Sequence, residues 1–168
     1  MASIRELLSR LTSNGVEYVI VGGVAARLHG STMATKDVDI CCRMNEANLA
    51  RLISALQPLH PKFRFHPKRP PLQHHPRDLA KFNMLNLSTD LADLDVMREV
   101  EPVGSYEQVL QKSVVMEIDG APARVLDLDS LIAAKSAAAR VKDKLGLIYL
   151  DSLKKRLAAG EQPPQPEL

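Results

Sequence analysis

The chain has 168 residues, of which 45% are hydrophobic and 25% are charged, a composition typical of one globular domain with a buried core. Its 22 Lys and Arg against 20 Asp and Glu give a net charge of +2, which excludes a whole-molecule electrostatic preference for nucleic acid. There is no secretory leader pattern at the start and no apolar run near the ~20 residues of a membrane span. The only cysteines, Cys41 and Cys42, are adjacent, which argues against a disulfide framework and predicts a cytoplasmic protein.

The first third of the chain predicts an N-terminal helix followed by a β-α-β-α order. Leu7 and Leu11 lie on one apolar stripe of a helix over residues 3–13, which ends at Asn14-Gly15. Apolar strand patterns and glycine or asparagine boundaries then predict strand 16–21, helix 22–30, strand 37–42 and helix 45–56.

Residues 60–81 differ in composition from the preceding segments. They predict a basic, proline-stiffened loop segment, called the excursion below, with at most short strands. The segment holds six Lys or Arg, five prolines and four of the five histidines. The histidine spacing matches no common zinc site. Its positive charge favours two readings equally: a solvated loop, or a surface that steers a nucleotide or an RNA end toward an anionic site.

The rest of the chain alternates between hairpins and helices. Two alternating stretches, 82–88 and 92–97, predict a hairpin around Thr89-Asp90, and Asp119-Gly120 predicts a second turn. The other expected elements are helix 105–113, strands 114–118 and 123–127, helix 129–141 and a last helix to about residue 159. We therefore expect a single domain over 1–159, helical over 127–159, and a disordered tail over 160–168.

Two carboxylates stand inside the second predicted strand. Residues two apart in a strand point to the same face with their Cα atoms ~6.6 Å apart, so Asp37 and Asp39 project together. Their mutual repulsion calls for a basic partner or a divalent cation, and Mg²⁺ prefers such oxygen ligands. Asp95 in the later strand is placed to complete the site, as in two-metal phosphoryl transfer.

Gly22 and Gly23 connect the first strand to the following helix. Glycine lets the backbone approach a polyphosphate closely, and the first helical turn offers free N–H groups. Each feature alone is weak evidence, because glycines at such turns and exposed aspartates on strands are common in proteins without a phosphate site.

The combination of Gly-Gly after an apolar strand, a helix, and Asp-Val-Asp in the next strand resembles the signature of the nucleotidyltransferase superfamily that includes DNA polymerase beta. The stretch "GVEYVIVGGVAARLHGSTMATKDVDI" is similar in particular to minimal bacterial nucleotidyltransferases related to abortive-infection and toxin–antitoxin toxins, and the likeness covers residues 14–145. It implies an α/β (α+β) fold with a small mixed sheet, helices packed on one side, and Mg²⁺- or Mn²⁺-dependent NMP transfer from an NTP.

The resemblance also implies roles for individual residues. Gly22 and Gly23 would contact the triphosphate, Asp37 and Asp39 would bind the metals, and Asp95 would act on the attacking hydroxyl. Asp93 shares the face of Asp95 but lies nearer the hairpin turn, so Asp95 is the preferred third acid.

The later helix carries two further candidates. Lys135 and Lys142 are seven residues apart on one helix face and would meet the triphosphate or RNA, although a solvated face with Asp143 as ion partner fits them nearly as well. Relatives often show an acid at the position of Gly146, so this chain departs from the pattern there.

Two functions of different classes remain open from the sequence. The first is an active nucleotidyltransferase whose acceptor is tRNA, a protein or a small molecule, acting as a toxin with a cognate antitoxin. The second is a non-catalytic nucleotide- or RNA-binding regulatory module that keeps the fold without turnover, which the glycine at 146 favours.

Overall fold

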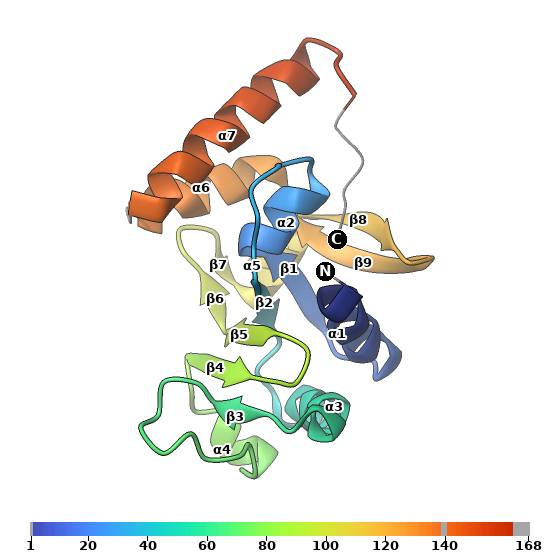
Figure 1. Ribbon diagram of the computed structural model, residues 1–168, viewed down its shortest axis with the longest axis vertical. Helices are drawn as coiled ribbons and strands as arrows, with labels where there is room; N and C mark the ends of the chain where they lie inside the picture. Colours follow the sequence, from blue (N-terminus) through green and yellow to red (C-terminus); the bar gives the residue numbers. More distant parts are fainter. Residues whose placement is uncertain (1, 139–140, 163–168) are drawn as a thin grey trace.

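The computed structural model of the chain describes residues 2–138 and 141–162, without the side chains of residues 2, 3 and 141–145. Its centre is a seven-stranded mixed sheet of order β3-β4-β5-β2-β1-β9-β8, with β6 and β7 as a separate pair (Figure 1). The strands are β1 Tyr18–Val21, β2 Asp37–Cys42, β3 Lys62–Phe63, β4 Met84–Ser88, β5 Asp93–Met97, β6 Glu99–Val100, β7 Gly104–Ser105, β8 Ser113–Ile118 and β9 Ala121–Leu126.

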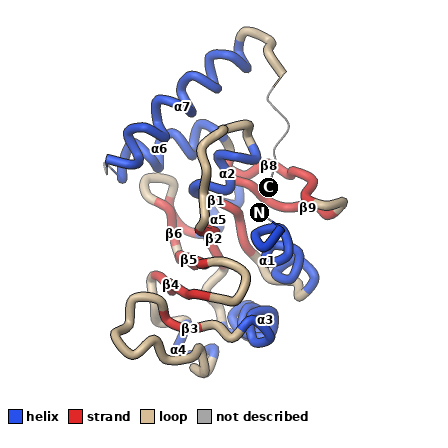
Figure 2. The backbone as a smooth tube through the Cα atoms, in the orientation of Figure 1, coloured by secondary structure: helices blue, strands red, loops and turns tan. Residues whose placement is uncertain are grey.

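Seven α-helices are described around this sheet, and Figure 2 shows how they alternate with the strands. They are α1 Ala2–Ser13, α2 Gly22–Leu28, α3 Glu46–Leu56, α4 Pro76–Leu79, α5 Tyr106–Gln111, α6 Leu128–Ala138 and α7 Val141–Ala158. A 3₁₀ turn, Gln57–Leu59, follows α3. None of the helices in the described ranges is long and apolar enough to cross a membrane.

One face of the sheet is the main core. Tyr18 pairs with Cys42 across β1 and β2, and its hydroxyl contacts Leu8 and Thr12 of α1. The Cys42 sulfur accepts a hydrogen bond from Asn48 of α3, so α1 and α3 both lie on this face. Because strand residues alternate, Val38 and Ile40 share the buried face while Asp37 and Asp39 point the other way.

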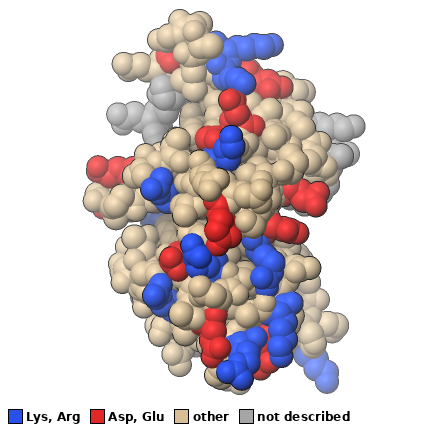
Figure 3. Space-filling view, turned by 180° about the vertical axis from the view of Figure 1, so that it is seen from behind, with Lys and Arg blue, Asp and Glu red and all other residues tan. Residues whose placement is uncertain are grey.

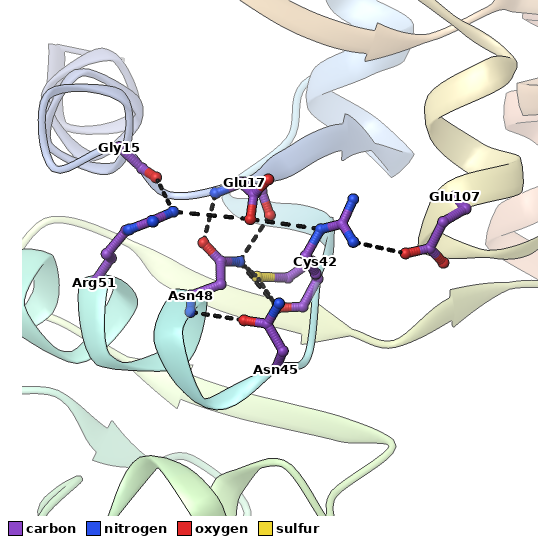
Figure 4. Close-up of polar contacts among 8 residues, drawn as sticks. Gly15, Glu17, Cys42, Asn45, Asn48, Arg51 and Glu107 are labelled. Carbon is purple, nitrogen blue, oxygen red and sulfur yellow. Dashed lines mark hydrogen bonds and ion pairs between the residues drawn. The ribbon is translucent and has the colours of Figure 1, made fainter.

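Asn48 is the one polar residue that is buried among the described residues, and its side chain joins α3 to the sheet (Figure 4). Its amide accepts from the N–H of Glu17 at 2.7 Å and donates to the carbonyls of Glu17 and Arg43 at 3.0 and 2.9 Å. Asn45 caps α3 by accepting from the N–H of Asn48 at 2.8 Å. The start of β1, the end of β2 and the start of α3 are thereby held in one fixed arrangement.

The predicted hairpins and helices are largely confirmed, with shifted boundaries. β4 and β5 pair antiparallel, and so do β8 and β9 around Asp119-Gly120, whose φ angles of 51° and 78° suit a tight hairpin turn. The strand expected over 16–21 begins at Tyr18, because Glu17 is engaged by Asn48.

Every described residue of the helix expected over 129–141 is helical: α6 runs from Leu128 to Ala138, and Val141 begins α7. The excursion over 60–81 contains the expected short strand, β3, but also the short helix α4. The sequence did not predict α4, because the many prolines around it indicate irregular backbone. His75 caps α4 and Pro76 occupies its first turn, where a missing N–H costs nothing. Residues 163–168 of the expected tail lie outside the described part of the chain.

Candidate functional site

Four aspartates form a square on two neighbouring strands. β2 and β5 run parallel, and their register pairs Asp37 with Asp93 and Asp39 with Asp95. All four side chains point to the face opposite the α1 and α3 core, since each is one residue away from a buried Val, Ile or Leu. Parallel pairing of strands that are far apart in sequence therefore gathers four carboxylates on one surface.

Two more strands extend this surface. Asn86 of β4 pairs with Asp95, and the N–H of Arg64, directly after β3, donates to the carbonyl of Asn86 at 2.8 Å. Arg64, Asn86, Asp95 and Asp39 thus form one row across four neighbouring chain segments. This row ends at Val21, the last residue of β1, which pairs with Asp39.

The guanidinium of Arg64 lies among three of the carboxylates. Its Nη2 donates to both oxygens of Asp95 at 2.6 and 2.8 Å, and its Nη1 lies 2.9 Å from Asp93 and 3.8 Å from Asp37. The Arg64 side chain is 12% exposed and that of Asp95 is 16% exposed, whereas Asp37 at 45% is open to solvent. The single positive charge of Arg64 therefore offsets part of the negative charge of Asp93 and Asp95.

The charge of Arg64 is secured by its surroundings. Burial disfavours a charged guanidinium, but the hydrogen bond to Asp93 and the charges of Asp95, Asp93 and Asp37 together raise the pKa of Arg64. Asn86 adds a further contact, donating its side-chain N–H to Asp95 at 2.8 Å. Asp95 therefore receives hydrogen bonds from both Arg64 and Asn86.

Asp39 is positioned by the Gly22–Gly23 bend. The N–H of Gly23 donates to Oδ2 of Asp39 at 3.4 Å. Gly22 has φ +61°, and a Cβ added there would lie 2.1 Å from Oδ2 and 2.8 Å from the Cβ of Asp39. Glycine is required at position 22 both for its left-handed backbone and for the close approach of this carboxylate.

The structure places the predicted lysines on the C-terminal helices. The amino group of Lys135 in α6 lies beside Gly146 of α7, where an added Cβ would be 3.1 Å from Nζ. The missing side chain at position 146 thus leaves room for this ammonium group. Lys142 and Asp143 fall within α7, but their side chains lie outside the described part of the structure. Contact of Lys135 or Lys142 with a triphosphate stays a prediction.

The donor set fits a hard divalent cation by its chemistry, because Asp37, Asp39 and Asp95 offer only carboxylate oxygens. Arg64 holds Asp95, whereas the Gly22–Gly23 bend holds Asp39. Within residues 2–138 and 141–162, no group of three His, Cys, Asp or Glu side chains has an arrangement that would hold a metal ion. A cation that used Asp95 would have to share or replace the oxygens that Arg64 holds.

The basic residues of the excursion divide into paired and solvent-facing ones. Arg64 joins the aspartates, Arg77 lies 3.6 Å from Glu46, and Lys81 lies 2.7 Å from Asp78. Figure 3 shows acidic and basic side chains intermixed over the lower half of the rear face. Arg64 of the excursion thus lies beside the aspartates, and no continuous basic field is seen on the face in Figure 3. Steering of a nucleotide or an RNA end by this segment stays a prediction.

Sequence patterns did not single out Arg64 or Asn86 as members of the site. Both carry a weak signal, since Asn86 alternates with Leu85 and Leu87, and Arg64 with Phe63 and Phe65. Alternation reveals which face a residue occupies, but not which strand lies next to it.

No family model matches the sequence, and no curated protein resembles it significantly. Solved structures with a similar fold include the lincomycin-bound lincosamide antibiotic adenylyltransferase LnuA, with 12% identity, TM-score 0.63, and coverage of 91% of this chain and 97% of that one. The complex of ANT(2″)-Ia with adenylyl-2″-tobramycin is 16% identical, with TM-score 0.55 and 93% of each chain covered. A putative nucleotidyltransferase from Thermotoga maritima is 18% identical, with TM-score 0.54 and coverage of 93% and 91%. The chain therefore has the nucleotidyltransferase fold.

Proposed function

We propose that the protein is a nucleotidyltransferase that moves an NMP from an NTP to a hydroxyl of an acceptor and releases pyrophosphate. The observation that carries this proposal is the square of Asp37, Asp39, Asp93 and Asp95 beside the Gly22–Gly23 bend. The fold supports it, because the similar structures are adenylyltransferases and a putative nucleotidyltransferase.

The proposed activity requires Mg²⁺ or Mn²⁺. Asp37 and Asp39 would hold the cation with Asp95, and when bound it would supply charge stabilisation on the phosphate oxygens. The chain's own groups have separate tasks. Gly22 and Gly23 would contact the triphosphate through their backbone at the end of β1, and Asp95, which is hydrogen-bonded by Asn86 and Arg64, would receive the acceptor hydroxyl.

The acceptor we favour is a small hydroxylated molecule. Two of the similar structures contain an antibiotic or its adenylylated form, and the face drawn in Figure 3 carries intermixed acidic and basic side chains, whereas a long RNA would need a basic track. A tRNA or protein acceptor, and a role as the toxin of a toxin–antitoxin pair, are the competing assignments that the sequence resemblance suggests.

Transfer of radiolabel from α-³²P-NTP tests the activity. Wild-type protein with Mg²⁺ is offered total RNA, total protein and a mixture of hydroxylated small molecules in separate reactions. We expect labelled product in the small-molecule pool, lost in Asp39→Asn because the carboxylate beside the bend becomes neutral. Asp90→Asn, at an exposed loop carboxylate, is the matched control and should retain transfer.

Equal labelling by wild type and Asp39→Asn would contradict the proposed activity. Label in RNA or protein alone would reassign the acceptor. A toxin role predicts in addition that expression arrests growth in wild type but not in Asp39→Asn, and that a cognate antitoxin relieves the arrest.

A second candidate is a nucleotide-binding module without turnover. It is favoured by the guanidinium of Arg64, which already supplies positive charge to Asp93 and Asp95 where an enzyme of this kind needs a cation. Calorimetric titration of an NTP with and without Mn²⁺ separates the two candidates. The enzyme requires the metal for tight binding, whereas the module binds equally well in its absence.

A further inference from the structure

An aromatic cavity of ≈ 350 Å³ lies at the open edge of the sheet, beside the aspartates. Its walls come from β3, β4 and the irregular segments around them, and include Phe63, Phe65, Phe82 and Met84. This volume is at the lower end of the ~300–1,000 Å³ range of small-molecule pockets, enough for one or two rings.

The cavity wall contains packed aromatic rings. Phe63 lies edge-on to His74 with centroids 5.1 Å apart and stacks with Phe82 at 6.4 Å and 30° between planes. His74 meets Phe82 edge-on at 6.5 Å. Such mutual contacts hold the rings in place and present fixed faces and edges to an incoming flat group.

Several of these apolar side chains are open to solvent. Phe65 is 73% exposed, Met84 46% and Phe82 41%. Exposed large apolar side chains gathered in a concave site indicate ligand binding more often than scattered ones do, because solvation of such a patch is unfavourable. Phe65 and Phe82 are the residues whose burial a ligand would complete.

The cavity is joined directly to the acid cluster. Asn86 lines it and donates to Asp95 at 2.8 Å. Arg64, which binds Asp95 on its other side, lies with its guanidinium carbon 4.7 Å from the centre of the Phe65 ring. A ligand inside the cavity is therefore one side chain away from the carboxylate that we propose to receive the acceptor hydroxyl.

The charge of the lining restricts the ligand. None of the residues that form the cavity is acidic. Arg64, whose guanidinium lies over Phe65, and Asp95, which Asn86 contacts, both lie behind this lining. A cationic ligand would therefore find no carboxylate within the lining to pair with, whereas an uncharged ring would meet phenylalanine and histidine rings, Met84 and the amide of Asn86.

We propose that the cavity binds the ring portion of the acceptor, and that the acceptor is an uncharged, ring-bearing alcohol or phenol whose hydroxyl reaches Asp95. The inference deepens the proposed function and rests on it for the transfer step. The binding step does not depend on metal or nucleotide, so it can be tested separately.

Binding of 2-naphthol, followed by ¹H–¹⁵N NMR and calorimetry on the full chain without metal or NTP, is the test. We expect shifts concentrated at residues 63–86, including the side-chain amide of Asn86. Phe65→Ala and Phe82→Ala should each weaken binding about tenfold, because each removes an aromatic contact. The control is Tyr149→Ala, an aromatic side chain 50% exposed on α7, at the far end of the molecule from β3 (Figure 1).

Charge selectivity is tested with 2-naphthylmethylammonium, which has the same ring system. We expect it to bind more weakly than 2-naphthol in wild type. The proposal is overturned if the ammonium compound binds at least as tightly, or if both phenylalanine variants, shown to be folded by circular dichroism, bind 2-naphthol like wild type. Asp39→Asn should bind 2-naphthol with the same affinity as wild type. If this variant loses nucleotidyl transfer but keeps 2-naphthol binding, the result tests the proposed function and leaves the binding proposal unaffected.

Discussion

At the scale of single residues, Arg64 determines the state of the acid cluster. Its guanidinium holds Asp95 through two hydrogen bonds and lies 2.9 Å from Asp93. A guanidinium and a divalent cation compete for the same carboxylate oxygens. The proposed binding of a metal ion would therefore depend on how readily Arg64 can be displaced from Asp95.

Replacing Arg64 with Gln should raise the affinity for Mn²⁺ by about tenfold, because the competing cation is removed while the carboxylates stay. The same change should lower the free energy of unfolding by about 1 kcal/mol, since three carboxylates lose a partner but remain partly hydrated. Mn²⁺ titration by calorimetry, with urea unfolding in parallel, measures both effects.

The matched control for Arg64 is Arg77→Gln, which removes a cation of the same excursion that pairs with Glu46 at the surface. Its Mn²⁺ affinity should equal that of wild type. Unchanged or weaker Mn²⁺ binding in Arg64→Gln would show that the guanidinium does not compete for the site.

At the scale of secondary-structure elements, the side chain of Asn48 fixes α3 against β1 and β2. Substitution by Ala removes three hydrogen bonds, those to the N–H of Glu17 and to the carbonyls of Glu17 and Arg43. We expect Asn48→Ala to lower the free energy of unfolding by about 3 kcal/mol, measured by urea denaturation.

Asn45 provides the comparison, because it belongs to the same contact network but contributes only the cap of α3 (Figure 4). Asn45→Ala should cost about 1 kcal/mol. If both variants lose the same small amount, the Asn48 amide contributes no more than an ordinary helix cap.

Comparison of predicted and observed elements shows which of them local sequence patterns are sufficient to predict. The hairpins at Thr89-Asp90 and Asp119-Gly120 were predictable because alternation and turn residues act within a few positions. The helix α4 was not, because five prolines in 60–81 conceal a single helical turn that His75 caps. Proline density thus indicates irregular backbone without defining its path.

At the scale of the whole molecule, the buried thiols of Cys41 and Cys42 make the free energy of unfolding depend on pH in the alkaline range. Burial, with the charges of Glu107 and Glu99, raises the pKa of Cys41 from 9.0 to about 12. Burial, with the neighbouring Cys41, raises that of Cys42 to about 12 despite the hydrogen bond from Asn48. Folded thiols keep protons that unfolded thiols lose near pH 9, so rising pH favours unfolding.

The free energy of unfolding should therefore fall between pH 8 and pH 10, by about 1 kcal/mol for each thiol. Urea denaturation at both pH values measures the change. Cys42→Ala should show a smaller difference between the two pH values than wild type, whatever its absolute stability. An identical difference in the two proteins would mean that Cys42 does not ionise on unfolding in this range.

The overall arrangement explains why the proposed nucleotide and acceptor sites share one surface. Asp39 lies at the Gly22–Gly23 bend. Two strands away in the same row, Asn86 lines the aromatic cavity, and beyond it Arg64 lies over Phe65 of that cavity. The row of side chains across β1, β2, β5 and β4 thus runs from the proposed triphosphate position to the proposed acceptor position.

The sequence alone determined the order of most elements, the shared face of Asp37 and Asp39, and the glycine bend before them, because strand alternation and turn chemistry are local properties. The preference for Asp95 over Asp93 as third acid remains a prediction. The structure shows only that Asp95 is level with Asp39 and Asp93 with Asp37.

Only the tertiary structure decided that Arg64 lies among the aspartates, that Asn86 orients Asp95, and that Phe63, Phe65 and Phe82 enclose a cavity beside them. These contacts depend on which strands become neighbours, in what register, and on how an irregular, proline-rich segment folds back on the sheet edge. A local pattern of hydrophobic and polar residues predicts neither the strand pairing nor the path of this segment, because contacts between distant segments depend on burial and packing of the whole chain.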